Sequence, residues 1–236
     1  MNAARSARQP VSSFGSFSDD GREYAVSTPA TPRDWYNYLW NERYVALFSH
    51  TAQGEALRQD RLGRRIPGVS GRMAFLRDRD SGAWWSLNGL PVDAQRGSYR
   101  CRHGMGYSII EQEAGGVASS WRCLVPREGS CEVWTLVLRN LGAVPRRLQL
   151  FVAADTVFDG ILRPQAYYGG SGAFERDLNA VALRRFQDFE GADRTWCYLG
   201  SGMPAAGADA SAAAFLGHGT LQRPDAVVRG ACTGSD

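Results

Sequence analysis

The triplet Arg102-His103-Gly104 is the part of the sequence whose residue types most directly suggest chemistry. Phosphatases that use a phosphohistidine nucleophile begin with an Arg-His-Gly run just after a strand, near the start of an α/β domain. Such a site also needs a second histidine, further arginines around the phosphate, and helix N-termini at the strand ends. The chain has only two other histidines, His50 and His218, and the sequence around the triplet is typical of hairpins. These features argue against a phosphatase.

The alternative is a structural role for the same residues. In the longer stretch YRCRHGMGY, Gly104 and Gly106 would shape the entry to a strand. We therefore expect His103 to make a structural hydrogen bond and to perform no chemistry.

Metal ligation is the second chemistry to consider. Asp78 and Asp80 have the spacing of a calcium loop, but the third ligand position is a glycine and no acidic residue closes the loop. A turn is the better interpretation. Five cysteines are scattered along the chain without the paired short spacing of a zinc site: Cys101, Cys123, Cys131, Cys197 and Cys232. We expect reduced thiols and no metal site.

Two aromatic stretches could contact a sugar. DWYNYLW (34–40) and RPQAYYGG (163–170) place Trp and Tyr rings beside Arg, Asn and Gln side chains. Such rings suit the apolar faces of a sugar, and the polar groups suit its hydroxyls. Packing in a hydrophobic core would produce similar runs, so both interpretations stay open.

Composition limits the partners. The 236 residues carry a net charge of +3, and all 27 basic residues are arginine. The arginine pairs are dispersed among acidic residues, so we expect no nucleic-acid binding. No stretch approaches the roughly 18 apolar residues of a membrane helix, so we expect no membrane contact and a cytoplasmic protein.

The elements that would position these residues are short β-type runs separated by turns, which predicts an all-β sandwich or barrel. Strands are expected at 44–50, and at 73–77 and 83–87, with the latter two joined as a hairpin by DRDSG. Gly115-Gly116 can take the positive φ angles of a two-residue turn between two further strands.

Three later stretches complete the prediction. The runs EVWTLVLRN and RRLQLFVAAD flank LGAVP and are expected to pair with one face buried, Leu148, Leu150 and Val152 alternating with Arg147, Gln149 and Phe151. Residues 55–67 are expected to be a long solvated loop. AFLGHG (214–219) is a single strand candidate.

Several stretches in succession form a pattern that can be compared with known families. The stretches are FSDDGREYAVSTPATPRDWYNYLWNERY, RDRDSGAWWS, YRCRHGMGYSIIEQE, SCEVWTLVLRNLGAVPRRLQLF, and RPQAYY followed by FERDLNAVALRRF. Together, in order over about residues 14 to 200, they resemble the N-terminal domain of the cellobiose phosphorylase family, which is glycoside hydrolase family 94, formerly glycosyltransferase family 36.

This resemblance implies a large antiparallel β super-sandwich of the galactose mutarotase type, joined through a helical linker to an (α/α)6 barrel. It also implies inverting phosphorolysis of a disaccharide or oligosaccharide, with inorganic phosphate as co-substrate and no other cofactor. One carboxylic acid protonates the glycosidic oxygen, and phosphate attacks from the opposite face. The acid and the phosphate site belong to the barrel, so we expect no catalytic residue here.

For this chain, the resemblance implies a disordered tail at 1–13 and the sandwich at 14–236, ending before the linker and barrel. A homodimer is implied for the complete enzyme. We therefore expect a carbohydrate-binding and assembly domain that is inactive without its barrel. The alternative is a free-standing carbohydrate-binding module that works with a separately encoded catalytic subunit.

The resemblance also suggests which residues approach the sugar. In family members a sandwich loop lends polar groups near the subsite for the leaving sugar, and RPQAYY is the candidate loop. Arg163 and Gln165 would donate hydrogen bonds, and Tyr167 would offer a stacking surface. An arginine fork suits the carboxylate of a sugar acid such as gluconate, and the pattern is closer to the cellobionic acid branch than to the cellobiose branch. The alternative is that this loop only packs on the barrel.

Overall fold

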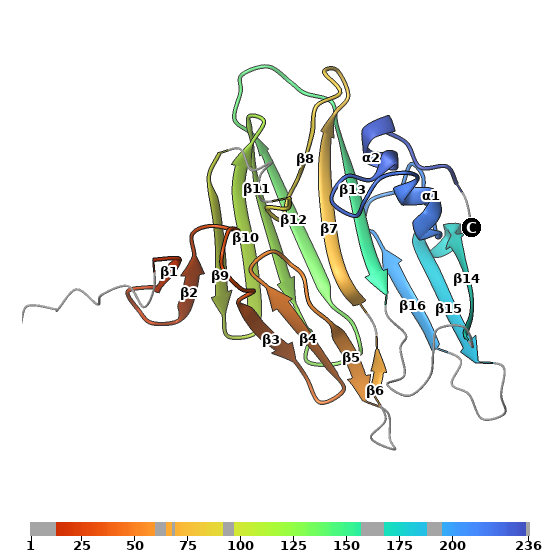
Figure 1. The fold of residues 1–236 in the computed structure, drawn as a ribbon, viewed down its shortest axis with the longest axis horizontal. Coiled ribbons are helices and arrows are strands. Elements are labelled where there is room, and N and C mark those ends of the chain that lie inside the picture. Colours follow the sequence, from red (N-terminus) through yellow and green to blue (C-terminus); the bar gives the residue numbers. More distant parts are fainter. Residues whose placement is uncertain are drawn as a thin grey trace, which may run out of the picture.

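The computed structural model of the chain describes residues 13–59, 65–67, 69–91, 97–156, 168–187 and 195–234. These residues form four antiparallel sheets and a few short helices (Figure 1), which confirms the all-β fold class. None of the described helices is long and apolar enough to cross a membrane. The predicted tail lies outside the described residues except for Ser13.

Six strands form the first sheet, in the order β1-β2-β9-β10-β11-β12. Their bounds are β1 (Gly15–Phe17), β2 (Glu23–Val26), β9 (Tyr99–Gly104), β10 (Tyr107–Ala114), β11 (Val117–Leu124) and β12 (Val133–Asn140). The predicted two-residue turn joins β10 to β11, with φ of 56° at Gly115 and 77° at Gly116. Because both angles are positive, two adjacent glycines suit this turn.

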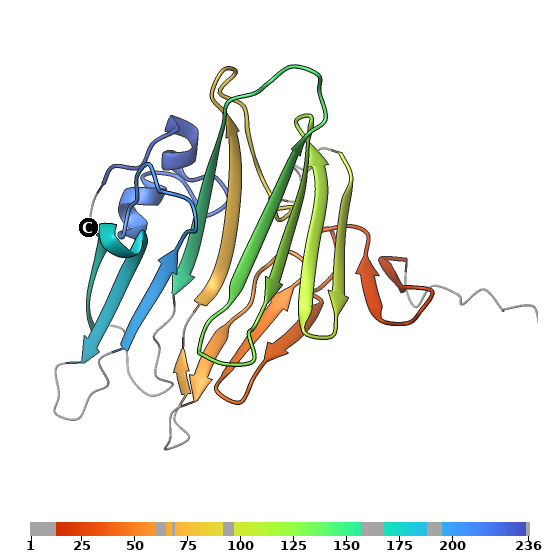
Figure 2. The ribbon, with the colours of Figure 1, turned by 180° about the vertical axis from the view of Figure 1, so that it is seen from behind.

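The second sheet has the order β3-β4-β5-β6 and lies across one face of the first, as Figures 1 and 2 show from opposite sides. Its strands are β3 (Tyr36–Trp40), β4 (Tyr44–Ser49), β5 (Ala56–Gln59) and β6 (Arg65–Pro67). The expected solvated loop at 55–67 is therefore wrong at both of its ends. These strands have only four and three residues, which is too short for an alternation to be visible in the sequence.

The third sheet has the order β13-β7-β8, and the fourth has the order β14-β15-β16. Their strands are β7 (Val69–Asp78), β8 (Trp84–Ser86), β13 (Leu148–Thr156), β14 (Tyr168–Glu175), β15 (Ala180–Gln187) and β16 (Thr195–Gly200). The helices are η3 (Arg176–Leu178), α1 (Ala212–Leu216) and α2 (Asp225–Arg229). The β7–β8 hairpin agrees with the prediction, with Phe75 opposite Ser86.

The predicted pairing of β12 with β13 is wrong, although both strands form. β12 pairs with β11 in the first sheet, and β13 pairs with β7 in the third. The buried face of β13 also differs from the simplest expectation, because Phe151 is 9% exposed and Leu150 is 42% exposed. Phe151 packs in the core cluster that contains Val227 of α2.

The strand expected at 214–219 is also wrong, because α1 occupies its start. The hydroxyl of Ser211 accepts from the backbone N–H of Ala214, and the N–H of Gly217 donates to the carbonyl of Ala213. A serine cap before the helix and a glycine after it are standard helix boundaries. They outweigh the strand propensity of the single Phe215.

Two hydrophobic clusters fill the interior. The first lies between the first two sheets and includes Trp121, whose ring meets Phe48 and Trp134 edge to face at centroid distances of 6.3 and 5.6 Å. The second joins the third sheet to α2. β7 contributes to both, because Ala74 and Leu76 belong to the first cluster and Met73 and Phe75 to the second.

A buried ion pair connects the sheets. Arg72 of β7 donates from Nε to Glu132 at 2.7 Å, and Glu132 immediately precedes β12. Arg72 Nη1 also donates to the carbonyls of Leu47 at 3.2 Å and Gly54 at 2.8 Å. Three sheets are therefore joined at one guanidinium group.

Candidate functional site

The residues predicted to contact sugar fall into two groups. Arg163, Gln165 and Tyr167 lie outside the described residues, so the structure leaves this prediction open. The other aromatic stretch, residues 34–40, is described and contains β3. It is the starting point for the site.

β3 presents a row of aromatic rings on its outer face. Tyr36, Tyr38 and Trp40 alternate with the inward-facing Asn37 and Leu39. Tyr38 is 62% exposed and Trp40 is 69% exposed, whereas Leu39 is fully buried. Core packing therefore does not explain these two rings, although it explains Leu39.

Asparagines hold both ends of this strand. Asn37 Nδ2 donates to the carbonyls of Gly104 and Tyr107, both at 2.9 Å, in the turn between β9 and β10. Asn41, directly after β3, donates from Nδ2 to the carbonyls of Pro126 and Gly129, both at 2.8 Å. The backbone that carries the rings is thus fixed to two neighbouring loops.

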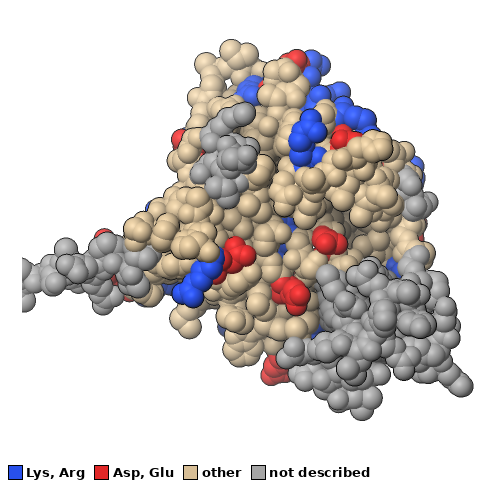
Figure 3. Space-filling model, viewed as in Figure 1, with Lys and Arg blue, Asp and Glu red and all other residues tan. Residues whose placement is uncertain are grey.

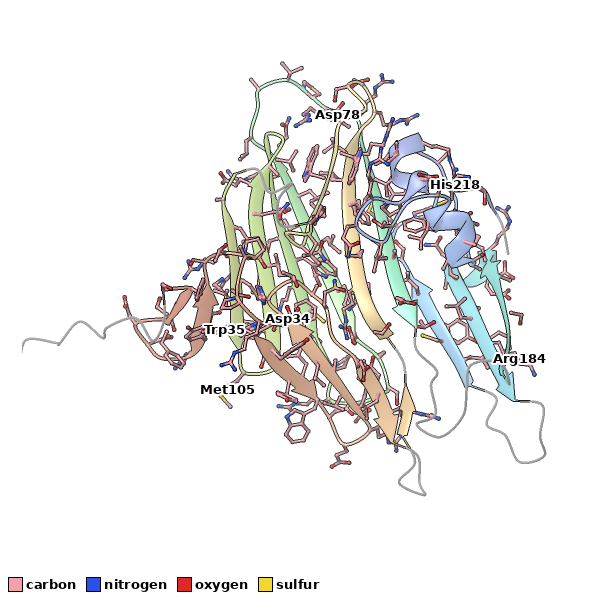
Figure 4. All side chains as sticks on the ribbon, viewed as in Figure 1. Asp34, Trp35, Asp78, Met105, Arg184 and His218 are labelled. Atoms are coloured by element: carbon pink, nitrogen blue, oxygen red, sulfur yellow. The ribbon has the colours of Figure 1, made fainter. Side chains whose placement is uncertain are left out.

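The rings border an open depression of about 460 Å³, which we call the aromatic hollow. Figure 4 places Met105, one of its lining residues, at the tip of the β9–β10 hairpin, on the same side of the molecule as Trp35. The aromatic hollow is lined by Phe17, Gly21, Arg22, Glu23, Tyr24, Asn37, Tyr38, Trp40, His103, Gly104, Met105 and Gly106.

His103 lines the aromatic hollow, and both of its ring nitrogens have hydrogen-bond partners. Its Nε2 lies 3.2 Å from the carbonyl oxygen of Trp35, which can only accept, so Nε2 carries the proton. Its Nδ1 lies 2.8 Å from the hydroxyl of Ser108 and accepts from it. Burial lowers the pKa of His103 to about 4, so the ring is neutral at pH 7. Both nitrogens are engaged, which confirms the predicted structural hydrogen bond.

Glu23, which lines the aromatic hollow, takes part in a group of ion pairs. Glu23 accepts from the hydroxyl of Tyr107 at 2.6 Å and from Arg102 at 2.9 Å, and Arg102 also pairs with Glu111 at 3.0 Å. The Tyr107 hydroxyl and the Arg102 guanidinium lower the pKa of Glu23. Glu23 is therefore ionised at neutral pH and is a poor candidate for a general acid.

The described residues also contain no group of three or more His, Cys, Asp or Glu side chains placed to hold a metal ion. Asp78 instead accepts from the backbone N–H groups of Asp80 and Ser81, both at 2.9 Å, and pairs with Arg146. These hydrogen bonds lower the pKa of Asp78. The Asp78 carboxylate therefore stabilises the turn between β7 and β8, where the sequence predicted a turn.

Several lining residues were missed by sequence reasoning, among them Phe17, Arg22 and Met105. The first two come from β1 and the turn before β2, and the third from the β9–β10 hairpin. Only the strand order brings these segments together, because β2 pairs with β9. A hydrophobic Met105 between two glycines was the one local signal.

Comparison with known proteins identifies the family of the chain. Residues 22–236 match the family model described as "Glycosyl hydrolase 94, supersandwich domain". The chain belongs to this family. The antiparallel sheets described above are its supersandwich domain, so the resemblance found in the sequence is confirmed.

The chain is also similar to several curated proteins that are named as phosphorylases. The domain is 31% identical over 224 residues to a 3-O-beta-D-glucopyranosyl-beta-D-glucuronide phosphorylase of Paenibacillus borealis, covering 94% of this chain and 29% of that protein. It is 28% identical over 239 residues to an N,N'-diacetylchitobiose phosphorylase of Vibrio proteolyticus, with the same coverages.

A larger protein also contains a similar segment. A cyclic beta-(1,2)-glucan synthase of Rhizobium meliloti (strain 1021) is 29% identical over 238 residues, which cover 94% of this chain and 8% of the synthase. The chain thus spans less than a third of the length of these relatives. Within the described supersandwich residues, the aromatic hollow offers stacking surfaces and hydrogen-bonding groups, and its one carboxyl group is held ionised.

Proposed function

We propose that the chain is the carbohydrate-binding and assembly part of an inverting glycoside phosphorylase. It would act with an (α/α)6 barrel, which supplies the catalytic acid and the phosphate site. The observation that carries this proposal is the supersandwich match over residues 22–236, together with relatives named as phosphorylases that are more than three times as long as the matched segment.

The reaction would cleave a disaccharide or oligosaccharide with inorganic phosphate to give a sugar 1-phosphate and a released sugar. An inverting enzyme places phosphate on the face opposite the leaving group, so one carboxylic acid is enough. The ion-paired Glu23 of the aromatic hollow does not suit that acid role. This domain would contribute binding and positioning, and it would show no phosphorolysis by itself.

We further propose that the released sugar is a sugar acid bound in part by Arg163, Gln165 and Tyr167. A guanidinium group matches a carboxylate with two parallel hydrogen bonds, which a neutral sugar cannot form. The relative at 31% identity is named as a glucuronide phosphorylase, and this name supports an acidic sugar on the substrate. For the complete enzyme we propose a homodimer in the cytoplasm.

The test compares this chain alone with a protein in which it is followed by its barrel. Both are incubated with phosphate and a panel of neutral and acidic disaccharides, and sugar 1-phosphate is followed by NMR. We expect product only with the barrel present, with inverted configuration at the anomeric carbon. Phosphorolysis by the isolated chain, or retention of configuration, would contradict the proposal.

The sugar contacts are tested in the synthetic direction. Arg163→Met should raise KM for an acidic acceptor at least tenfold and change KM for a neutral acceptor much less. Gln165→Ala should raise KM for both acceptors, because it removes a ground-state contact. Unchanged KM values in both variants would show that Arg163 and Gln165 do not contact the acceptor sugar.

A further inference from the structure

We propose that the aromatic hollow binds an uncharged oligosaccharide chain, with Trp40 and Tyr38 as its stacking surfaces. The inference goes beyond the proposed function, because it concerns binding by this chain alone and needs no barrel. It rests on four observations: free aromatic faces, a fixed strand, balanced charge and a limited volume.

The first observation is that the rings on β3 lack aromatic partners. Among the described residues, the side chains of Tyr38 and Trp40 neither stack on another ring nor make a hydrogen bond. The other exposed pair behaves differently, because Trp196 and Tyr198 of β16 stack on each other at 6.1 Å and an interplanar angle of 14°. Exposing two large rings costs free energy unless a ligand covers them.

The second observation is that the rings are held in place before any ligand binds. Side chains two residues apart on a strand lie on the same face, about 7 Å apart along it. Asn37 and Asn41 fasten the strand to the loops on either side. A fixed pair of rings loses little conformational entropy on binding, so even the weak attraction between a ring and a pyranose face yields net affinity.

The third observation is the charge of the lining. Among the described residues that line it, Arg22 and Glu23 are the only charged ones, and they have opposite signs. Glu23 is already neutralised by Arg102, and Arg22 lies 3.7 Å from Asp20. A phosphorylated or acidic ligand would find no surplus positive charge. In Figure 3, most of the blue surface on this face of the molecule lies beside the tip of β7 and α2, and a smaller blue patch beside the start of β3 has red surface next to it.

The fourth observation is size. A volume of about 460 Å³ suits a small ligand of a few sugar units. A stable protein interface buries about 800 Å² on each partner, which is more than a few exposed side chains provide. Since the aromatic hollow is open to solvent, a chain can enter with its ends outside. The tyrosine hydroxyl, the indole N–H and the Arg22 guanidinium can donate to sugar hydroxyls.

The test is titration of the 236-residue chain with cellohexaose and with laminarihexaose, followed by calorimetry and tryptophan fluorescence. We expect at least one hexasaccharide to bind. Trp40→Ala should weaken its binding at least tenfold and Tyr38→Ala severalfold, while Trp40→Phe should retain most of the affinity. Trp196→Ala and Tyr198→Ala are the matched controls, because these rings are also exposed, and they should leave Kd unchanged.

Three results would overturn the proposal. The wild-type chain could bind neither hexasaccharide, or Trp40→Ala and Tyr38→Ala could bind as tightly as wild type. Alternatively, sedimentation could show a wild-type dimer that Trp40→Ala dissociates, which would assign the rings to contact between copies. Circular dichroism checks that each variant is folded. Absence of phosphorolysis in the complete enzyme would count against the proposed function and not against this site.

Discussion

Arg72 connects three sheets of the sandwich through one buried guanidinium group. Its side chain is fully buried, and that of its partner Glu132 is 4% exposed. Glu132 also accepts from the Tyr44 hydroxyl at 3.0 Å and from the Trp134 indole at 2.8 Å. These groups satisfy a carboxylate that burial would otherwise protonate, and they hold its pKa below the ordinary value despite burial.

Removing one partner of this pair should be severe. Arg72→Met leaves Glu132 buried without its main partner, which we expect to cost about 3–5 kcal/mol of unfolding free energy. The measurement is urea denaturation followed by circular dichroism. The control is Arg147→Ala, which breaks a solvent-exposed pair with Asp80 and should cost much less, because water and salt screen such a pair. Equal losses in the two variants would contradict this account.

His103 should make stability depend on pH. Because burial lowers its folded pKa from 6.5 to about 4, the unfolded chain takes up this proton first as the pH falls. Stability is therefore complete above pH 6.5 and declines toward pH 4, by on the order of 3 kcal/mol from this residue. Burial also lowers the pKa of His50, which adds a loss in the same direction.

The variant His103→Gln separates this effect from acid denaturation in general. A glutamine can still donate to Trp35 and accept from Ser108, but it does not titrate. We expect unfolding free energy, measured at several pH values between 7 and 4, to fall less steeply than in wild type. A wild-type slope in His103→Gln would refute the argument.

At the scale of elements, the β9–β10 hairpin depends on one backbone conformation. Gly106 has a φ of +83°, and a Cβ there would meet no atom within 4 Å. Gly106→Ala should therefore cost about 1–2 kcal/mol through backbone strain alone. Gly106→Asn should cost less, because asparagine tolerates this region. The melting temperature measures both, and Gly202→Ala, which has space and no positive φ, should leave it nearly unchanged.

An element could be predicted from the sequence when the residues that determine it lie close together in the chain. The β10–β11 hairpin was predictable because its turn and its alternation are both local to the sequence. The partners of β12 and β13 were not, since each pairs according to the packing of the whole sandwich. The same holds for the aromatic hollow. Its β3 rings were visible in the sequence, but Phe17 and Met105 join them only through the strand order.

At the scale of the molecule, β7 connects the two hydrophobic clusters, because its side chains pack in both. Six consecutive residues, Gly71–Leu76, are buried, so this strand has no solvent face in its middle. Alternation directs Leu76 into the cluster around Trp121 and Phe75 into the cluster with Val227 of α2. A substitution on either face of β7 is therefore expected to alter the packing of both clusters.

This arrangement predicts cooperative unfolding. Leu76→Ala and Phe75→Leu each remove contacts from one cluster only, and Leu76→Ala alone should cost about 2–5 kcal/mol. We nevertheless expect each variant to lower the opening free energy equally in β4, on the first cluster, and in β13, on the second, as measured by hydrogen exchange with mass spectrometry. The two sheets share β7, so neither cluster can open while that strand stays packed. Faster exchange confined to the altered cluster would show instead that the third sheet and α2 unfold separately from the rest.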